Sequence, residues 1–158
     1  MAIHNSIASM LSESLPEMLS VSKYCIEFEK KSDGGCYGYP AALLLLSIVD
    51  SIGSYAGHDK NTRDHFNVLN DCKYFNLSLS KDEIDTIFEY RNLLSHNTTL
   101  KVGVKLSKGT NNQKIIEKSN GNYKLNLIPL YDLTYNAVDH LLSTLTNENR
   151  MIQTIMKK

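Results

Sequence analysis

The stretch from Ser80 to Asn97 constrains the fold most, because it combines a helix start signal with a helical hydrophobic pattern. Ser80 and Glu83 have the S-x-x-E spacing of a capping box. Apolar side chains then recur at helical intervals, at Ile84, Ile87, Phe88 and Leu94. We therefore predict an amphipathic helix that buries one face and ends near His96 or Asn97.

Polar groups crowd the last turns of this predicted helix. They are the guanidinium of Arg91, the amide of Asn92, the hydroxyl of Ser95 and the imidazole of His96. Asn92 and His96 are four residues apart and share a face. Arg91 points about 100° away from Asn92 on an ideal helix, although its long stem can swing back.

The run R91-N92-L93-L94-S95-H96 resembles the Arg-polar-x-x-x-His signature of the HEPN superfamily. HEPN domains are compact helical domains of many prokaryotic toxins, defence proteins and RNA-processing enzymes. The preceding helix ALLLLSIVDSIGSY, which contains Asp50, also resembles the equivalent helix of bacterial members. Toxin members often carry a tyrosine two positions after the histidine, where this chain has Thr98.

The resemblance implies a metal-independent ribonuclease without a cofactor or a metal site. Such an enzyme acts as a homodimer, and its composite site binds RNA between the motifs of the two chains. Arg91 is then the phosphate clamp, His96 the acid or base, and Asn92 the residue that orients them, with Asp50 and Ser95 in support. Such an enzyme would serve in defence or in a toxin–antitoxin system, where an antitoxin or another protein partner restrains it.

Two other functions fit the same residues. Arginine and histidine at a helix C-terminus oppose the helix dipole and cap free carbonyls without catalysis, as in a non-catalytic dimerisation or interaction domain. A phosphate-ligand binder is the third possibility. An enzyme requires Arg91 and His96 to be solvent-accessible in a shared cleft, whereas an interaction domain predicts buried side chains with satisfied hydrogen bonds.

Asp50 interrupts the most apolar helix, which is predicted to open at Pro40 and to end near Ala56. A carboxylate in such a helix is costly to bury unless it is paired. Asp50 is therefore either exposed or capped, or it is the partner of Arg91 or an orienter of His96.

The first thirty residues predict either one helix kinked at Pro16 or two helices, because Ser14 and Glu17 also have capping-box spacing. A shorter helix is predicted from Thr62 to Phe75. Its apolar spacing predicts burial of Phe66, Leu69 and Cys72.

After the motif the hydrophobic pattern changes from helical to strand-like. Val102, Val104 and Leu106 alternate with polar residues, and Asn120-Gly121 is a strong tight-hairpin signal. We predict a mostly α fold, a HEPN-like helical bundle with a small antiparallel β-hairpin or meander at about 100–128, inserted before a C-terminal helix at about 131–156.

The segment from Lys101 to Lys124 is rich in lysine, with Glu117 as its single acidic residue. These lysines, Lys101 and Lys105 first among them, are candidates for contacts with an RNA backbone. Lysines also protect exposed edge strands from aggregation, which is an equally good explanation of the pattern.

Composition predicts one globular domain over residues 1–158, in the cytoplasm and without a membrane span. Hydrophobic residues make up 42% and charged residues 22%, and the formal net charge is zero. The three cysteines form no C-x-x-C pair. The remaining histidines lack metal-ligand spacing and are predicted to be solvent-facing or core residues: His4, His58, His65 and His140.

Overall fold

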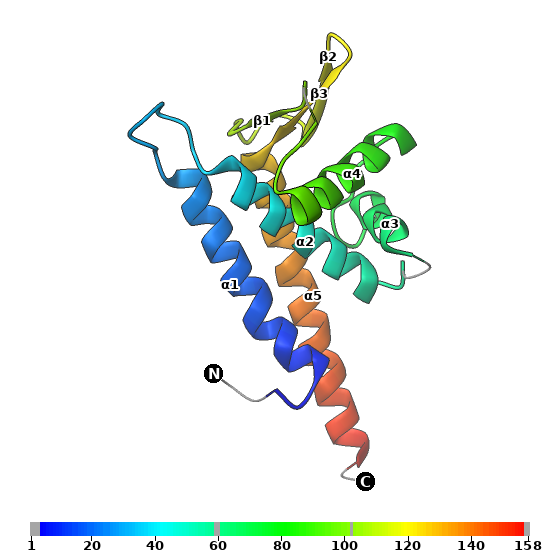
Figure 1. Cartoon of the computed structure of the whole chain (residues 1–158). Coiled ribbons are helices and arrows are strands. Elements are labelled where there is room, and N and C mark those ends of the chain that lie inside the picture. The colour runs from blue at the N-terminus through cyan, green and yellow to red at the C-terminus, as the bar shows by residue number, and fades with distance from the viewer. Residues whose placement is uncertain (1–3, 59–60, 102, 157–158) are drawn as a thin grey trace.

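The computed structural model describes residues 4–58, 61–101 and 103–156, with side chains up to residue 146 in the last helix. Val102 therefore lies outside the described residues. The fold is mostly helical, with a small sheet at one end (Figure 1). In chain order the elements are α1 (Ile7–Glu27), α2 (Gly38–Tyr55), α3 (Thr62–His65), η1 (Phe66–Asn70), α4 (Lys81–Asn97), β1 (Lys105–Ser107), β2 (Ile116–Ser119), β3 (Asn122–Asn126) and α5 (Leu127–Met156).

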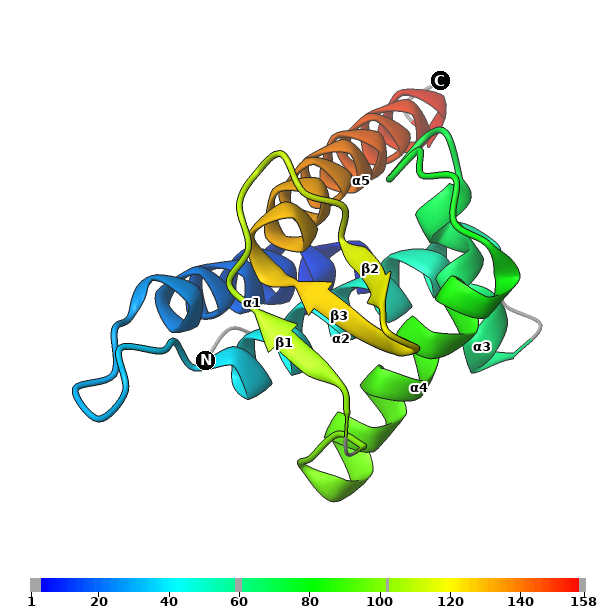
Figure 2. The ribbon, with the colours of Figure 1, turned by 90° about the horizontal axis from the view of Figure 1, so that it is seen from above.

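Helix α2 is the central element. It packs against α1, α3, η1, α4, α5 and β1, and Figure 2 shows it beneath the sheet. Its side chains Leu45, Leu46, Ile48 and Ile52 are fully buried. The helix predicted to be the most apolar, from Pro40 to near Ala56, is thus the one that most other elements contact. A charged group on α2 that turns inward must therefore find a partner in another helix, whereas the hydroxyls of Ser47 and Ser51 donate to carbonyls of α2 itself.

Helix α1 is a single helix that contains Pro16, so the alternative of two helices is wrong. Ser6 caps it, accepting a hydrogen bond from the backbone N–H of Ser9 at 3.1 Å. Ser14 forms no capping box because it lies inside the helix. Burial of Leu15 and Leu19 on both sides of the proline supports a continuous helix, since packing outweighs the lost backbone hydrogen bond.

The predicted helix from Thr62 to Phe75 is too long. Regular α-structure ends at His65, and a 3₁₀ segment continues only to Asn70. The Asn70 side chain then donates to the Leu79 carbonyl and accepts from the Leu79 N–H, both at 2.8 Å. This pairing folds the chain back, so Cys72, predicted to be buried, is exposed.

The sheet is mixed, not purely antiparallel. The hairpin β2–β3 is antiparallel as predicted, with positive φ at both Asn120 and Gly121. β1, however, pairs in parallel with β3 and gives the order β1-β3-β2. The alternation of apolar and polar residues predicts strands but not their direction. The chain forms β1 on one side of β3 and then crosses over to form β2 on the other side.

Helices α4 and α5 flank the sheet in the sequence. The capping box of α4 is confirmed, with Ser80 and Glu83 making reciprocal hydrogen bonds. Thr98 ends this helix in the left-handed conformation at φ 53°. α5 begins at Leu127, directly after β3, and is a single long helix lying beside α1 (Figures 1 and 2).

Candidate functional site

Asp50 is the centre of a polar junction between α2, α3 and α4. Only 9% of the residue is exposed. Its Oδ1 lies 2.5 Å from His65 Nδ1, and its Oδ2 lies 2.6 Å from Arg91 Nη2. One carboxylate thus holds an imidazole and a guanidinium. This double pairing offsets the cost of burying a charge in the most apolar helix.

Gly53 explains how His65 reaches Asp50. It lies three residues after Asp50 on the same face of α2. A Cβ placed at Gly53 would lie 2.0 Å from the His65 carbonyl oxygen, so only glycine lets the α3 backbone approach this closely. Asn61 starts α3 by accepting a hydrogen bond from the Asp64 N–H. Together the cap and the glycine set the position of the His65 imidazole.

Arg91 is fixed by two side chains. Besides its ion pair with Asp50, Nη1 donates a hydrogen bond to Asn92 Oδ1 at 3.2 Å. Its Nε is buried without a hydrogen-bond partner among the described residues, while 24% of the side chain is exposed. The guanidinium therefore has a fixed orientation, and part of the Arg91 side chain remains exposed.

Tyr90 lies on the buried side of the same turn. It is 1% exposed, and its hydroxyl has no hydrogen-bond partner in the part of the chain that the structure describes. Burial raises the pKa of Tyr90 to about 12, since a phenolate would be poorly solvated there.

His96 and Ser95 are exposed on the last turn of α4. His96 follows Arg91 by five residues, which on an ideal helix is a rotation of about 140° and a rise of about 7.5 Å. On an ideal helix the two side chains therefore leave α4 in directions about 140° apart. Asp50 contacts Arg91, one of its two expected partners, but the imidazole that it holds belongs to His65, not to His96.

His65 and Asp50 open onto a shallow hollow between α1, α2 and α3, with a volume of about 360 Å³. The rest of its lining is apolar and hydroxyl-bearing: Ile7, Leu11, Ser51, Ser54 and Tyr55. His65 was predicted from the sequence to be only a solvent-facing or core residue. The usable signal was Gly53, a glycine one turn from a carboxylate in an apolar helix, which is typical of close backbone approach.

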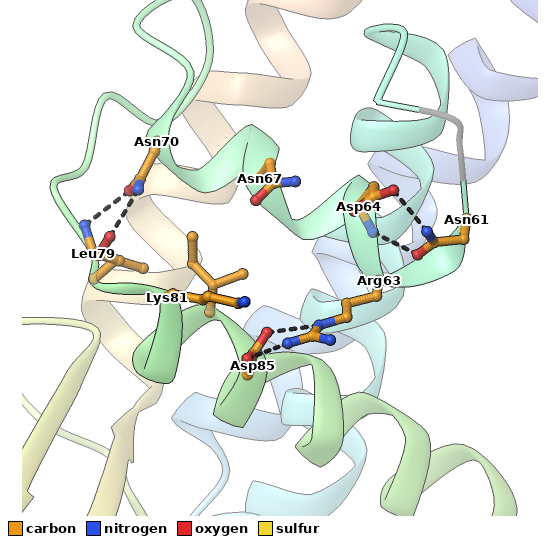
Figure 3. Close-up of a pocket in the computed structure, with 9 residues that line it drawn as sticks. Asn61, Arg63, Asp64, Asn67, Asn70, Leu79, Lys81 and Asp85 are labelled. Atoms are coloured by element: carbon orange, nitrogen blue, oxygen red, sulfur yellow. Dashed lines mark hydrogen bonds and ion pairs between the residues drawn. The ribbon is translucent and has the colours of Figure 1, made fainter.

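A second arginine–aspartate pair lies in a polar pocket of about 450 Å³ between α3, η1 and the start of α4 (Figure 3). Arg63 Nε donates to Asp85 Oδ1 at 2.7 Å, and Nη2 contacts Oδ2. The hydrogen bond from Arg63 lowers the pKa of Asp85, and the same bond raises the pKa of Arg63. Lys81 and Asp64 also line the pocket, so its formal charges cancel.

Three of the six lysines between Lys101 and Lys124 form ion pairs with acidic side chains within the described part of the chain. Lys101 forms an ion pair with Glu89, Lys124 Nζ lies 2.6 Å from Glu117, and Lys118 Nζ lies 3.7 Å from Asp82. Lys105 is exposed and has no ion pair within the described part of the chain. Of Lys101 and Lys105, the first candidates for RNA contacts, Lys105 alone has no acidic partner among the described residues.

Among the described residues, no group of three or more His, Cys, Asp or Glu side chains is arranged to hold a metal ion. The described helices also include none that is long and apolar enough to cross a membrane. No family model matches this chain, and no curated protein or solved structure matches it significantly.

Proposed function

We propose that this chain is a metal-independent ribonuclease of HEPN type that acts as a homodimer. The observation that supports it most is the fixed guanidinium of Arg91, held by Asp50 and Asn92 on a helix whose exposed end carries His96. Arg91 would bind the scissile phosphate and His96 would transfer a proton.

The direction of the side chains is the reason for proposing a dimer. Since Arg91 and His96 of one α4 diverge by about 140°, a phosphate held by Arg91 needs an imidazole from elsewhere. A twofold arrangement that brings the ends of two α4 helices together would place the partner subunit's His96 opposite Arg91. Cyclic dimers are the commonest homo-oligomers.

The chemistry requires a base, an acid and a cation. The base removes the proton of a ribose 2′-hydroxyl, whose oxygen attacks the adjacent phosphorus. The cation stabilises the charge that develops on the phosphoryl oxygens, and the acid protonates the departing 5′-oxygen. The products are a 2′,3′-cyclic phosphate and a 5′-hydroxyl.

One observation favours the second candidate, a non-catalytic interaction domain. Arg91 already has an acidic partner and an amide partner in the isolated chain, as expected of a residue that joins helices. In this alternative His96 only opposes the dipole of α4.

The test is cleavage of end-labelled RNA in EDTA by the wild type and by His96→Ala, prepared identically. His140→Ala is the matched control, because His140 is also an exposed helical histidine. We expect His96→Ala to lose about 100-fold or more in rate and the control to keep the wild-type rate.

The product ends and the oligomeric state complete the experiment. Cyclic-phosphate ends from the wild type would support the mechanism. Equal cleavage by His96→Ala would contradict it. No cleavage by a dimeric wild type would favour the interaction domain.

A further inference from the structure

We propose that His65 is the catalytic base of this site, taking the 2′-hydroxyl proton of a single-stranded RNA bound in the hollow between α1, α2 and α3. The inference rests on the proposed ribonuclease function and adds a second imidazole from the same chain as Arg91.

The hydrogen bonding of His65 prepares it for this role. An ionised carboxylate only accepts hydrogen bonds, so the imidazole donates its Nδ1–H to Asp50 across 2.5 Å. In the neutral ring the lone pair then lies on Nε2. Among the described residues Nε2 has no hydrogen-bond partner, and it is not among the buried unpartnered atoms. Nε2 is therefore not completely buried, in a side chain of which 15% is exposed.

Asp50 joins the base, which lines the hollow, to the phosphate clamp Arg91, which is not among the residues that line it. Asp50 binds His65 with one oxygen and Arg91 with the other, so a single carboxylate fixes both groups. Histidine bases in hydrolytic sites are commonly oriented by a carboxylate on Nδ1 in this way. Among the histidines of the described residues that pair with a carboxylate, His65 is the one that shares its partner with an arginine.

The hollow in front of His65 suits a nucleotide better than a small ion. Tyr55, which is 41% exposed, offers a ring face on which a base can stack. Ile7 and Leu11 supply apolar surface, while Ser51 and Ser54 supply hydroxyl groups on α2 next to Asp50.

The proton balance closes with two histidines. His65 Nε2 takes the 2′-hydroxyl proton as the 2′-oxygen bonds to phosphorus and the bond from phosphorus to the 5′-oxygen breaks. A protonated His96, from the partner subunit, donates a proton to that departing oxygen. Each cleavage thus moves one proton onto His65 and one off His96, and exchange with water restores both.

His65→Asn separates catalysis from structure, because the asparagine amide can replace the Nδ1–H donor to Asp50 but cannot act as a base. His58→Gln is the matched control. His58 also pairs with a carboxylate, Asp71 at 3.2 Å, but through Nε2 and without an arginine. Its glutamine keeps a donor near that position.

The experiment measures single-turnover cleavage of a labelled single-stranded RNA and the affinity for its 2′-deoxy analogue, which cannot be cleaved. We expect His65→Asn to slow cleavage by about 100-fold or more, with the affinity for the analogue and the unfolding midpoint close to those of the wild type. His58→Gln should cleave at the wild-type rate.

Each of the other outcomes contradicts either the role of His65 or the proposed ribonuclease function. If His65→Asn cleaves like the wild type while His96→Ala is inactive, His65 is not the base and the ribonuclease function stands. If His65→Asn loses affinity or unfolds along with its activity, its role is structural and the inference fails. If the folded wild type does not cleave RNA at all, the proposed function itself fails.

Discussion

Two arginine–aspartate pairs of this protein have the same chemistry in different surroundings. Arg91 and Asp50 are largely buried, and the aspartate also binds His65. Arg63 and Asp85 lie at the edge of the pocket in Figure 3, with 47% and 34% of their side chains exposed. A buried charge that loses its partner is costly, whereas an exposed pair is replaced by water at little cost. An arginine–aspartate contact by itself therefore does not show how much the pair contributes to stability. The burial of the pair decides that contribution.

The largest expected effect comes from Asp50→Asn. Loss of the charge leaves Arg91 without a counterion, and we expect the free energy of unfolding to fall by about 4 kcal/mol. The matched variant Asp85→Asn should change stability far less. Urea titration of both variants measures the difference, and equal losses would show that the two pairs do not differ as argued.

Gly53→Ala tests the close approach that brings His65 to Asp50. The new Cβ would overlap the His65 carbonyl oxygen, and we expect a loss of about 3 kcal/mol with displacement of α3. Gly38→Ala is the control in the same helix, since its Cβ would meet only side-chain atoms at 3.6 Å. A Gly53→Ala variant as stable as Gly38→Ala would refute the packing described for α3.

Tyr90→Phe extends the comparison to hydroxyl groups. Removing a buried hydroxyl without a partner should stabilise the protein by about 1 kcal/mol. Tyr123→Phe, which loses a hydrogen bond at 2.6 Å to the exposed Asp82, should give no gain. Thermal melts of both variants provide the measurement.

Alkaline pH gives an independent check on Tyr90. Its pKa is raised on folding, so its ionisation does not affect stability below about pH 10, the usual value, and lowers stability progressively as the pH rises toward 12. The unfolding midpoint of the wild type should therefore fall more steeply above pH 10 than that of Tyr90→Phe. Parallel curves would contradict the raised pKa.

The smallest effect is expected at low pH from the exposed pair. Asp85 has a lowered pKa, so the stability that it contributes is present above the usual pKa of an aspartate and is lost as the pH falls through its folded value. The small difference between the wild type and Asp85→Asn should vanish in acid. A difference that persists below that value would show that Asp85 acts by something other than its charge.

Local sequence determined the elements whose signals are complete within a few residues. The capping box at Ser80 and the hairpin at Asn120-Gly121 both form as predicted, because each satisfies its own backbone groups. The length of α1 and the early end of α3 could not be predicted in this way. Packing around Pro16 and the pairing of Asn70 with Leu79 depend on residues elsewhere in the fold or in the chain.

The residues of the candidate site also differ in whether local sequence or tertiary packing determines their contacts. The sequence alone determined that Arg91, Asn92 and His96 lie at the end of a helix, and that a carboxylate at position 50 needs a partner. Only the tertiary structure decided which partners it has, because Asp50, His65 and Arg91 come from three helices that meet where Gly53 lets two backbones touch. Helical periodicity sets the direction of a side chain within its own helix, whereas the choice of imidazole depends on how the helices pack.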